Sequence, residues 1–128
     1  MCFSVWAESG AYNNAVAEAV RAFVDDATAE RFLQSRDVPT ASGLRQKFVT
    51  AGFRDVTVAR SEMKNRLPNI ADFVSEHLLG VPIADRVSLL SDAERRSLGE
   101  DAAKRLERYA DGQDAVVPDY INLIIARK

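Results

Sequence analysis

The carboxyl-terminal segment limits the folds open to this chain more than any other part of it. Residues 120–126 read YINLIIA, an apolar run interrupted only by Asn122. A short run of this kind, rich in isoleucine and apolar on both faces, is typical of a central strand. The segment therefore predicts a sheet in which the last strand, residues 119–126, lies between two others.

Two further segments are predicted strands. Residues 2–7, CFSVWA, are apolar at nearly every position and indicate a second strand covered on both faces. Residues 54–61 alternate instead, with Val56 and Val58 on one face and Asp55 and Thr57 on the other. Three strands separated by helical segments predict one α/β domain, residues 1–128, with helices packed on both faces of its sheet.

Caps and glycines mark the expected helices of the amino-terminal half. Asn13 or Asn14 is expected to cap a helix with a valine-rich buried stripe. Thr40 or Ser42 is expected to cap the next helix. That helix should end at Gly52, in the left-handed conformation that glycine adopts without strain, directly before the alternating strand.

A helical insert is predicted between the second and third strands, at about residues 68–112. Its first helix begins near a possible cap at Asn69 and ends at Gly80. Ser91 and Glu94 have the spacing of a capping box, which predicts a long helix that stops near Gly112.

The bulk composition excludes several classes of function. The 128 residues contain 17 Lys and Arg and 19 Asp and Glu, mixed along the chain, so no basic stripe is available for nucleic acid. No apolar run is long enough to predict a membrane span or a secretion signal. Cys2 is the only cysteine, which is consistent with a reducing cytoplasm. We interpret Cys2 as a core residue of the first strand.

The side chains that carry chemistry give no catalytic signature. His77, the only histidine, is either a general base or a surface or boundary residue. No cysteine or second histidine can join it in a metal site, so no metal is predicted. Adjacent carboxylates such as Asp25 and Asp26 point about 100° apart on a helix and are interpreted as solvated faces. No catalytic residue is therefore assigned.

The order of these segments resembles the carboxyl half of class I S-adenosylmethionine-dependent methyltransferases, in the group that includes ubiquinone and menaquinone biosynthesis enzymes. The likeness covers nearly the whole chain and depends on the AGF joint before a strand and on the closing strand, which ends in ARK. The resemblance implies a partial Rossmann-like sheet of strands 2–7, 54–61 and 119–126, the last one antiparallel and central.

The resemblance also implies a place for the methyl acceptor. In the family, the loop after the fifth strand and the helical insert shape the acceptor pocket. Here these segments carry the substrate-side candidates Trp6, Tyr12, Asn13, Arg66, Phe73 and His77. The alternative is that Trp6 and Phe73 belong to the core and that Tyr12 and Asn13 only begin a helix.

The family's cofactor half has no counterpart in these residues. The glycines stand at positions 10, 43, 52, 80, 99 and 112, so no GxG turn is present to approach S-adenosylmethionine. The expectation is that the isolated chain binds no donor. The missing half would leave residues 2–7 with an unpaired edge, which predicts a homodimer, a strand-exchanged oligomer or pairing with an upstream-encoded amino-terminal half.

Three functions remain open at this level. The first is a methyltransferase-like protein that transfers a methyl group to a small molecule only when a partner supplies the cofactor-binding half. The second is a noncatalytic dimeric module that binds a protein or an apolar small molecule. The third is an unrelated small α+β domain with its own pocket.

Overall fold

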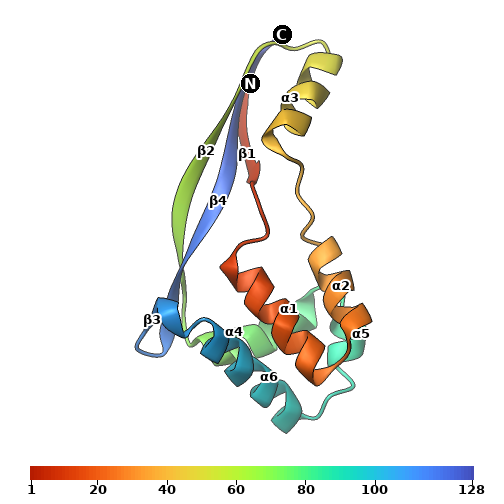
Figure 1. The fold of residues 1–128 in the computed structure, drawn as a ribbon, viewed down its shortest axis with the longest axis vertical. Helices are drawn as coiled ribbons and strands as arrows, with labels where there is room; N and C mark the ends of the chain where they lie inside the picture. The colour runs from red at the N-terminus through yellow and green to blue at the C-terminus, as the bar shows by residue number, and fades with distance from the viewer.

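The chain forms a twisted antiparallel sheet with a helical body at one end. A computed structural model describes residues 1–128 and is mixed α/β, with six α-helices and a four-stranded sheet (Figure 1). The elements in chain order are β1 (Cys2–Trp6), α1 (Ala11–Phe23), α2 (Asp26–Gln34), α3 (Ala41–Thr50), β2 (Arg54–Leu67), α4 (Ile70–His77), η1 (Leu78–Gly80), α5 (Ala84–Val87), α6 (Asp92–Arg105), η2 (Glu107–Tyr109), β3 (Ala110–Asp111) and β4 (Asp114–Arg127).

The closing strand is central, as its composition predicts. The strand order is β1-β4-β2, and β4 pairs antiparallel with both neighbours. The short strand β3 pairs with the beginning of β4. Because β1 and β2 both run opposite to β4, they run parallel to each other, and β1 has a partner on one edge only.

The predicted strands 54–61 and 119–126 are too short. Both β2 and β4 contain 14 residues, and they continue as a two-stranded ribbon beyond the end of β1. In this extension of β2 the side chains of Glu62, Lys64 and Arg66 are polar and exposed, and only Met63 and Leu67 on the other face are apolar, so the alternation that marks a half-buried strand is weak. Pro118 lies in the extension, where one edge of β4 is free and an absent N–H is tolerated.

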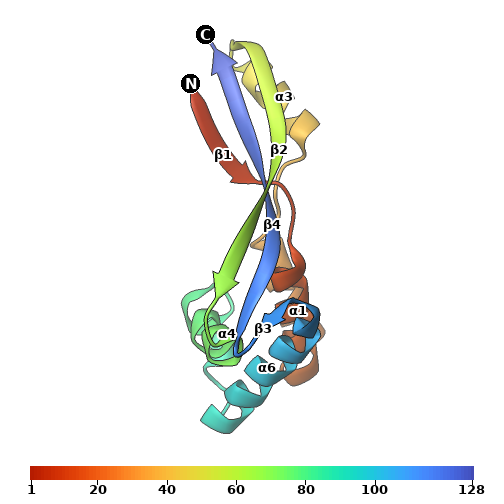
Figure 2. The same ribbon diagram turned by 90° about the vertical axis from the view of Figure 1, so that its left-hand side faces the viewer.

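The ribbon is strongly twisted and contributes side chains to two separate hydrophobic cores. Ala115 and Val117 of β4 pack into the helical body, whereas Ile124 and Ala126 pack with residues of α3 and β2. Odd and even residues point to opposite faces of a strand. The ribbon therefore turns over between Val117 and Ile124, and Figure 2 shows β2 and β4 crossing in this region.

The helix α3 ends as its sequence predicts. Of the two expected caps, Thr40 accepts the bond from the Gly43 amide. Gly52 has φ of +85°, and the Phe53 amide donates to the Phe48 carbonyl at 3.0 Å. The Phe48 and Phe53 rings, 5.4 Å apart, complete this Schellman-type stop and join α3 to the start of β2.

The larger core lies in the helical body, where α1, α2, α4, α5 and α6 enclose a cluster of 17 buried residues. The capping box of Ser91 and Glu94 is confirmed at the start of α6. The predicted end of that helix near Gly112 is wrong, because α6 stops at Arg105 and Gly112 occupies the turn between β3 and β4 with φ of +65°. The cap of α1 is Gly10, and not Asn13 or Asn14.

The prediction of helices on both faces of the sheet is also wrong. In Figure 1 the helix α3 and the helical body lie on the same side of the ribbon. Trp6 is 49% exposed, Leu123 37% and Ile125 53%, and Cys2 is exposed rather than in the core. The register places these four residues on one bare face, with Trp6 paired to Ile121 and Cys2 to Ile125. Composition alone does not reveal whether a helix covers an apolar face.

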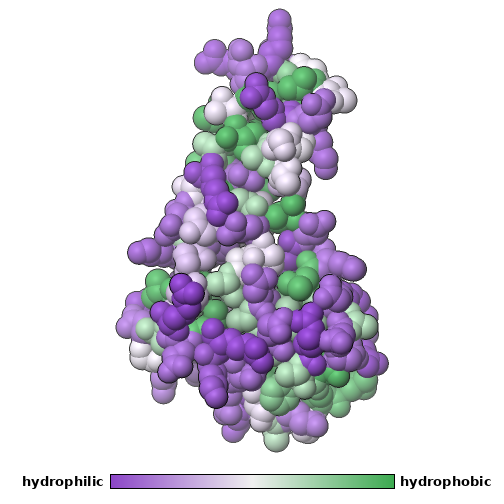
Figure 3. All heavy atoms as spheres, in the orientation of Figure 1, coloured by the Kyte–Doolittle hydropathy of each residue, from purple (hydrophilic) through white to green (hydrophobic).

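The surface seen from the direction of Figure 1 is mostly hydrophilic. Figure 3 shows polar side chains over much of the broad helical end, with hydrophobic atoms in scattered groups. The two chain termini lie close together at the narrow end, where the Met1 amino group donates to the Ala126 carbonyl at 2.8 Å (Figure 1).

Candidate functional site

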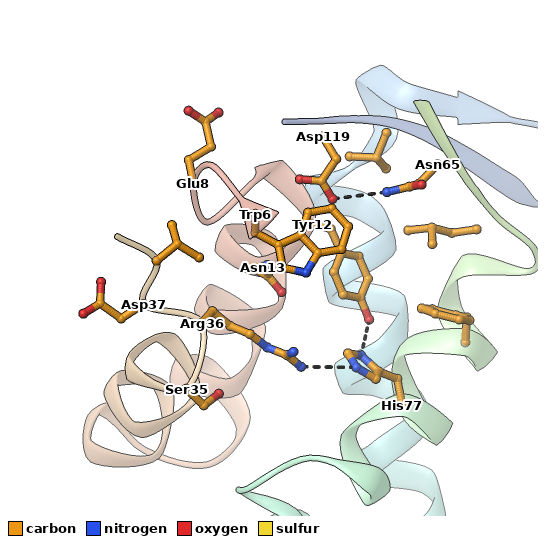
Figure 4. Close-up of a pocket in the computed structure, with 14 residues that line it drawn as sticks. Trp6, Glu8, Tyr12, Asn13, Ser35, Arg36, Asp37, Asn65, His77 and Asp119 are labelled. Atoms are coloured by element: carbon orange, nitrogen blue, oxygen red, sulfur yellow. Dashed lines mark hydrogen bonds between the residues drawn. The ribbon is translucent and has the colours of Figure 1, made fainter. Parts of the chain in front are cut away.

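A pocket opens where β1 ends, between the ribbon and the helical body. Its volume is about 320 Å³, at the lower end of the range for small-molecule sites. Side chains from β1, α1, the loop between α2 and α3, the ribbon and α4 converge on it (Figure 4). The lining residues are Trp6, Glu8, Tyr12, Asn13, Ser35, Arg36, Asp37, Val38, Asn65, Leu67, Phe73, His77, Val117 and Asp119.

The structure brings five of the six substrate-side candidates into this one pocket: Trp6, Tyr12, Asn13, Phe73 and His77. Trp6 is the last residue of β1, and its exposure excludes the core interpretation. Tyr12 and Asn13 lie in the first turn of α1, as the alternative interpretation of these residues predicted, and they also line the pocket. Phe73 packs against the helical core and lines the pocket as well.

The sixth candidate, Arg66, does not line the pocket. It lies between Asn65 and Leu67, which do, and alternate residues of a strand point to opposite faces. Its guanidinium group pairs with Asp111 at 2.5 Å and Asp114 at 2.9 Å. All three side chains are substantially exposed, so we expect these pairs to contribute little stability and to fix the turn between β3 and β4.

Aromatic rings form one wall of the pocket. Phe73 and His77 are four residues apart on α4 and therefore share a face, with their rings stacked at 5.7 Å. Tyr12 from α1 meets both rings, at 5.9 Å from Phe73 and 5.6 Å from His77. The wall offers flat apolar surface to a planar ligand.

A hydrogen-bonded chain runs along this wall. The Tyr12 hydroxyl lies 2.7 Å from Nδ1 of His77, and a terminal nitrogen of Arg36 lies 3.3 Å from Nε2 (Figure 4). Arginine only donates, so Nε2 must accept and the proton of the neutral ring must sit on Nδ1. His77 therefore donates to the Tyr12 oxygen, and the hydroxyl hydrogen of Tyr12 is left free for another acceptor.

The protonation states agree with this arrangement. Burial lowers the pKa of His77, and the positive charge of Arg36 lowers it further, so the ring is neutral at pH 7. Burial raises the pKa of Tyr12 well above its ordinary value, against a smaller opposing effect of Arg36, so the hydroxyl keeps its proton.

Arg36, Asn65 and Asp119 are pocket residues that the sequence does not single out. Arg36 follows α2 in a loop, and no local pattern connects it to α4. Asn65 of β2 donates to Asp119 of β4 at 3.2 Å, across the part of the ribbon that extends beyond β1. Asn65 and Asp119 could have been found from the sequence only if the full lengths of β2 and β4 had been predicted.

The pocket does not fit S-adenosylmethionine as the resemblance describes its site. No glycine lines the pocket, and so no backbone turn approaches it in the way that the glycine-rich loop requires. No group of three or more His, Cys, Asp or Glu side chains is placed to hold a metal ion.

A larger hollow of about 1020 Å³ lies between α3 and β2. It is an open groove lined by Arg45, Val49 and neighbouring residues, without the convergent hydrogen bonds of the aromatic pocket. We therefore take the smaller pocket as the candidate site.

No protein-family profile matches the chain, and no curated protein sequence matches it. Among its helices, none combines the length and the apolar character needed to cross a membrane. The candidate site therefore has to be interpreted from its own geometry.

The position of His77 predicts a pH dependence of stability. Because its pKa is lower in the folded chain than its ordinary value of 6.5, the unfolded chain takes up the proton first as the pH falls. The stability that neutral His77 contributes is therefore fully present above its ordinary pKa of 6.5 and is lost as the pH falls through the lower pKa of the folded chain. Urea unfolding at a series of pH values should show stability decreasing between about pH 7.5 and pH 5.

The matched variant for this prediction is His77→Gln, which keeps a hydrogen-bonding side chain but does not titrate. Since His77 is the only histidine, the difference between variant and wild type isolates its contribution. We expect the decrease to be smaller in the variant. If stability depended on pH in the same way in the two proteins, the pKa of His77 would be the same in the folded and unfolded chains, which would contradict the prediction.

Proposed function

We propose that this chain binds a small planar molecule in the aromatic pocket and presents it as the acceptor of a methyl group. The observation that carries the proposal is the convergence of Trp6, Tyr12, Phe73 and His77, from β1, α1 and α4, on one pocket beside the carboxyl end of β1. Ligands of α/β sheets commonly bind outside this end of the strands. These are also the segments from which the methyltransferase resemblance expects an acceptor site.

The strand order supports the same proposal. An antiparallel closing strand between two strands that run parallel to each other is the arrangement that the resemblance implies for the carboxyl half of a Rossmann-like methyltransferase sheet. Helix α4, in the segment between β2 and β4, contributes Phe73 and His77 to the pocket, and the resemblance expects an insert at this point of the chain to shape the acceptor site.

Methyl transfer in this proposal requires a partner that holds S-adenosylmethionine, because none of the 128 residues forms a glycine-rich turn. The chain's own contribution is to orient the acceptor and exclude water from it, which is the main requirement of a reaction with little acid or base chemistry. Because Cys2 is a free thiol, we propose that the protein works in the reducing cytoplasm.

The test uses cells that lack the coding sequence. Whole extracts that retain their small molecules, supplied with methyl-labelled S-adenosylmethionine, should lose one labelled small-molecule product relative to the wild type, and added purified chain should restore it. A Phe73→Ala chain should restore it poorly, because the aromatic wall is broken. An unchanged set of labelled products would contradict methyl transfer.

A second candidate function, a noncatalytic interaction module, is favoured by the bare face of the sheet. Leu123 and Ile125 are exposed in the middle of this face, and β1 beside them has a free edge. An apolar face next to an unpaired edge favours association with another chain, such as a second copy. Light scattering should then show a dimer that an Ile125→Lys variant dissociates, together with an unchanged set of labelled products.

A further inference from the structure

Arg36 is the one cation in the aromatic pocket, and no acidic side chain pairs with it. The other charged lining residues are Glu8, Asp37 and Asp119, and none of them lies within ion-pair distance of Arg36. Glu8 pairs with Arg60 at 2.8 Å, and Asp119 accepts from Asn65 and from the Tyr120 amide. Glu8 and Asp119 are thus engaged elsewhere, Asp37 forms no ion pair with Arg36, and the positive charge of Arg36 has no acidic partner.

The guanidinium group of Arg36 is nevertheless held in place. It lies 5.2 Å from the centre of the fully buried Phe32 ring, and one of its terminal nitrogens donates to Nε2 of His77. Its Nε is buried without a hydrogen-bond partner. A buried donor without an acceptor costs free energy, and a fixed arginine fork matches the two oxygens of a carboxylate.

A second donor is available to the same ligand. The bond from Arg36 to Nε2 of His77 directs the Nδ1 proton to the Tyr12 oxygen, so the Tyr12 hydroxyl has a hydrogen to donate. Figure 4 shows the Arg36 side chain and the Tyr12 hydroxyl pointing toward the same histidine from different directions. Donors from two elements therefore meet at one end of the aromatic wall.

The size and walls of the pocket select the rest of the ligand. A volume of about 320 Å³ accommodates one or two fused rings with a short substituent. The Tyr12 and Phe73 rings can pack against the faces and edges of such rings, and Trp6 lies at the rim.

We propose that the ligand is an aromatic carboxylic acid whose carboxylate is bound by Arg36 and Tyr12 and whose ring packs against Phe73 and Trp6. This inference rests on the proposed function, since it names the chemical class of the acceptor. It concerns binding alone and does not depend on the donor half.

The experiment measures binding of naphthoate and of its neutral amide, naphthamide, to the whole chain by calorimetry. The indole N–H signal of Trp6, the only tryptophan, locates binding at the pocket by nuclear magnetic resonance. We expect saturable naphthoate binding that shifts this signal, and an affinity for naphthamide at least about ten-fold weaker, since the amide lacks the charge that Arg36 recognises.

The deciding variant is Arg36→Met, which keeps the length of the side chain without its charge. It should lose about ten-fold or more of the affinity for naphthoate and leave that for naphthamide within about two-fold. Arg36→Lys should recover part of the loss. Arg105→Met, which removes an arginine paired with Asp101 on α6 outside the pocket, is the control and should bind both probes as the wild type does. A dispersed resonance spectrum checks that each variant is folded.

The outcomes separate this inference from the proposed function. Equal affinity for the two probes, an undiminished affinity of Arg36→Met for naphthoate, or no naphthoate binding at all would overturn the aromatic acid as ligand. Restoration of the labelled product in the deletion extract would stand in each case. Charge-dependent binding with unchanged labelled products would instead retain the ligand and contradict methyl transfer.

Discussion

Replacing Phe32 with alanine is expected to lower the free energy of unfolding by about 3–5 kcal/mol, a large part of the stability of a domain of this size. Phe32 of α2 is fully buried among the 17 residues of the helical core. The substitution removes the whole ring and leaves a cavity that helices on several sides cannot fill without moving. Urea unfolding gives the change directly as a lower midpoint with an unchanged slope.

The matched control is Leu89→Ala, which removes a large apolar side chain that is 75% exposed and should change the stability by less than about 0.5 kcal/mol. Losses of the same size for Phe32 and Leu89 would contradict the burial of Phe32. Phe32→Leu adds a functional comparison, because it retains much of the volume but removes the aromatic face under Arg36. This variant should fold and bind naphthoate more weakly than the wild type.

The sheet was predictable in its order and less so in its extent. The apolar composition of residues 120–126 predicted the central position of the closing strand, whereas the similarly apolar residues 2–7 form an edge strand, so composition distinguishes the two positions only in part. The ends of β2 and β4 were not predictable, since in this part of β2 only Met63 and Leu67 are apolar and the hydrophobic period is therefore weak. The pairing of the two strands depends on contacts between residues about 50 positions apart.

The faces of the sheet show a second limit of sequence reasoning. Leu123 and Ile125 have the composition of buried strand residues but lie on a bare face. Their partners in the register, Ser4 and Cys2, are exposed as well. Hydrophobic character indicates that a surface is suited to burial, and only the arrangement of the helices decides whether this chain buries it.

Local stop signals were predictable where one residue determines the conformation. Gly52 follows a helix directly and precedes an alternating strand, and it adopts the expected left-handed conformation. Gly112 also has positive φ, but in a strand turn, because α6 had already ended at Arg105. A glycine thus marks a change of direction more reliably than it marks which element ends there.

The candidate site was predictable only through the resemblance. The likeness to methyltransferases selected the loop after the first strand and the helical insert, and the structure brings Trp6, Tyr12 and His77 together from those segments. Arg36 was missed because it reaches the pocket from a loop 41 residues away from His77, and a single sequence contains no signal for such a contact. Arg66 is the reverse case: its strand lines the pocket through Asn65 and Leu67, as the prediction required, but its own side chain does not line the pocket.

Replacing Gly99 with alanine is expected to destabilise the chain by about 2 kcal/mol, although alanine is the better helix former by about 1 kcal/mol. At Gly99 the helix α6 passes close to α4. A Cβ atom there would lie 2.2 Å from the Ala71 carbonyl oxygen and 2.5 Å from Oγ of Ser75. A backbone oxygen cannot move aside alone, so the two helices must separate.

The control for this substitution is Gly80→Ala, because a Cβ atom at Gly80 would meet no atom within 4 Å. It should leave the stability within about 0.5 kcal/mol of the wild type in the same urea experiment. Since α4 also carries Phe73 and His77, its displacement in Gly99→Ala should weaken naphthoate binding as well, although Gly99 lies outside the pocket. A Gly99→Ala protein more stable than the wild type would mean that helix propensity prevails and that α4 and α6 are not in close contact.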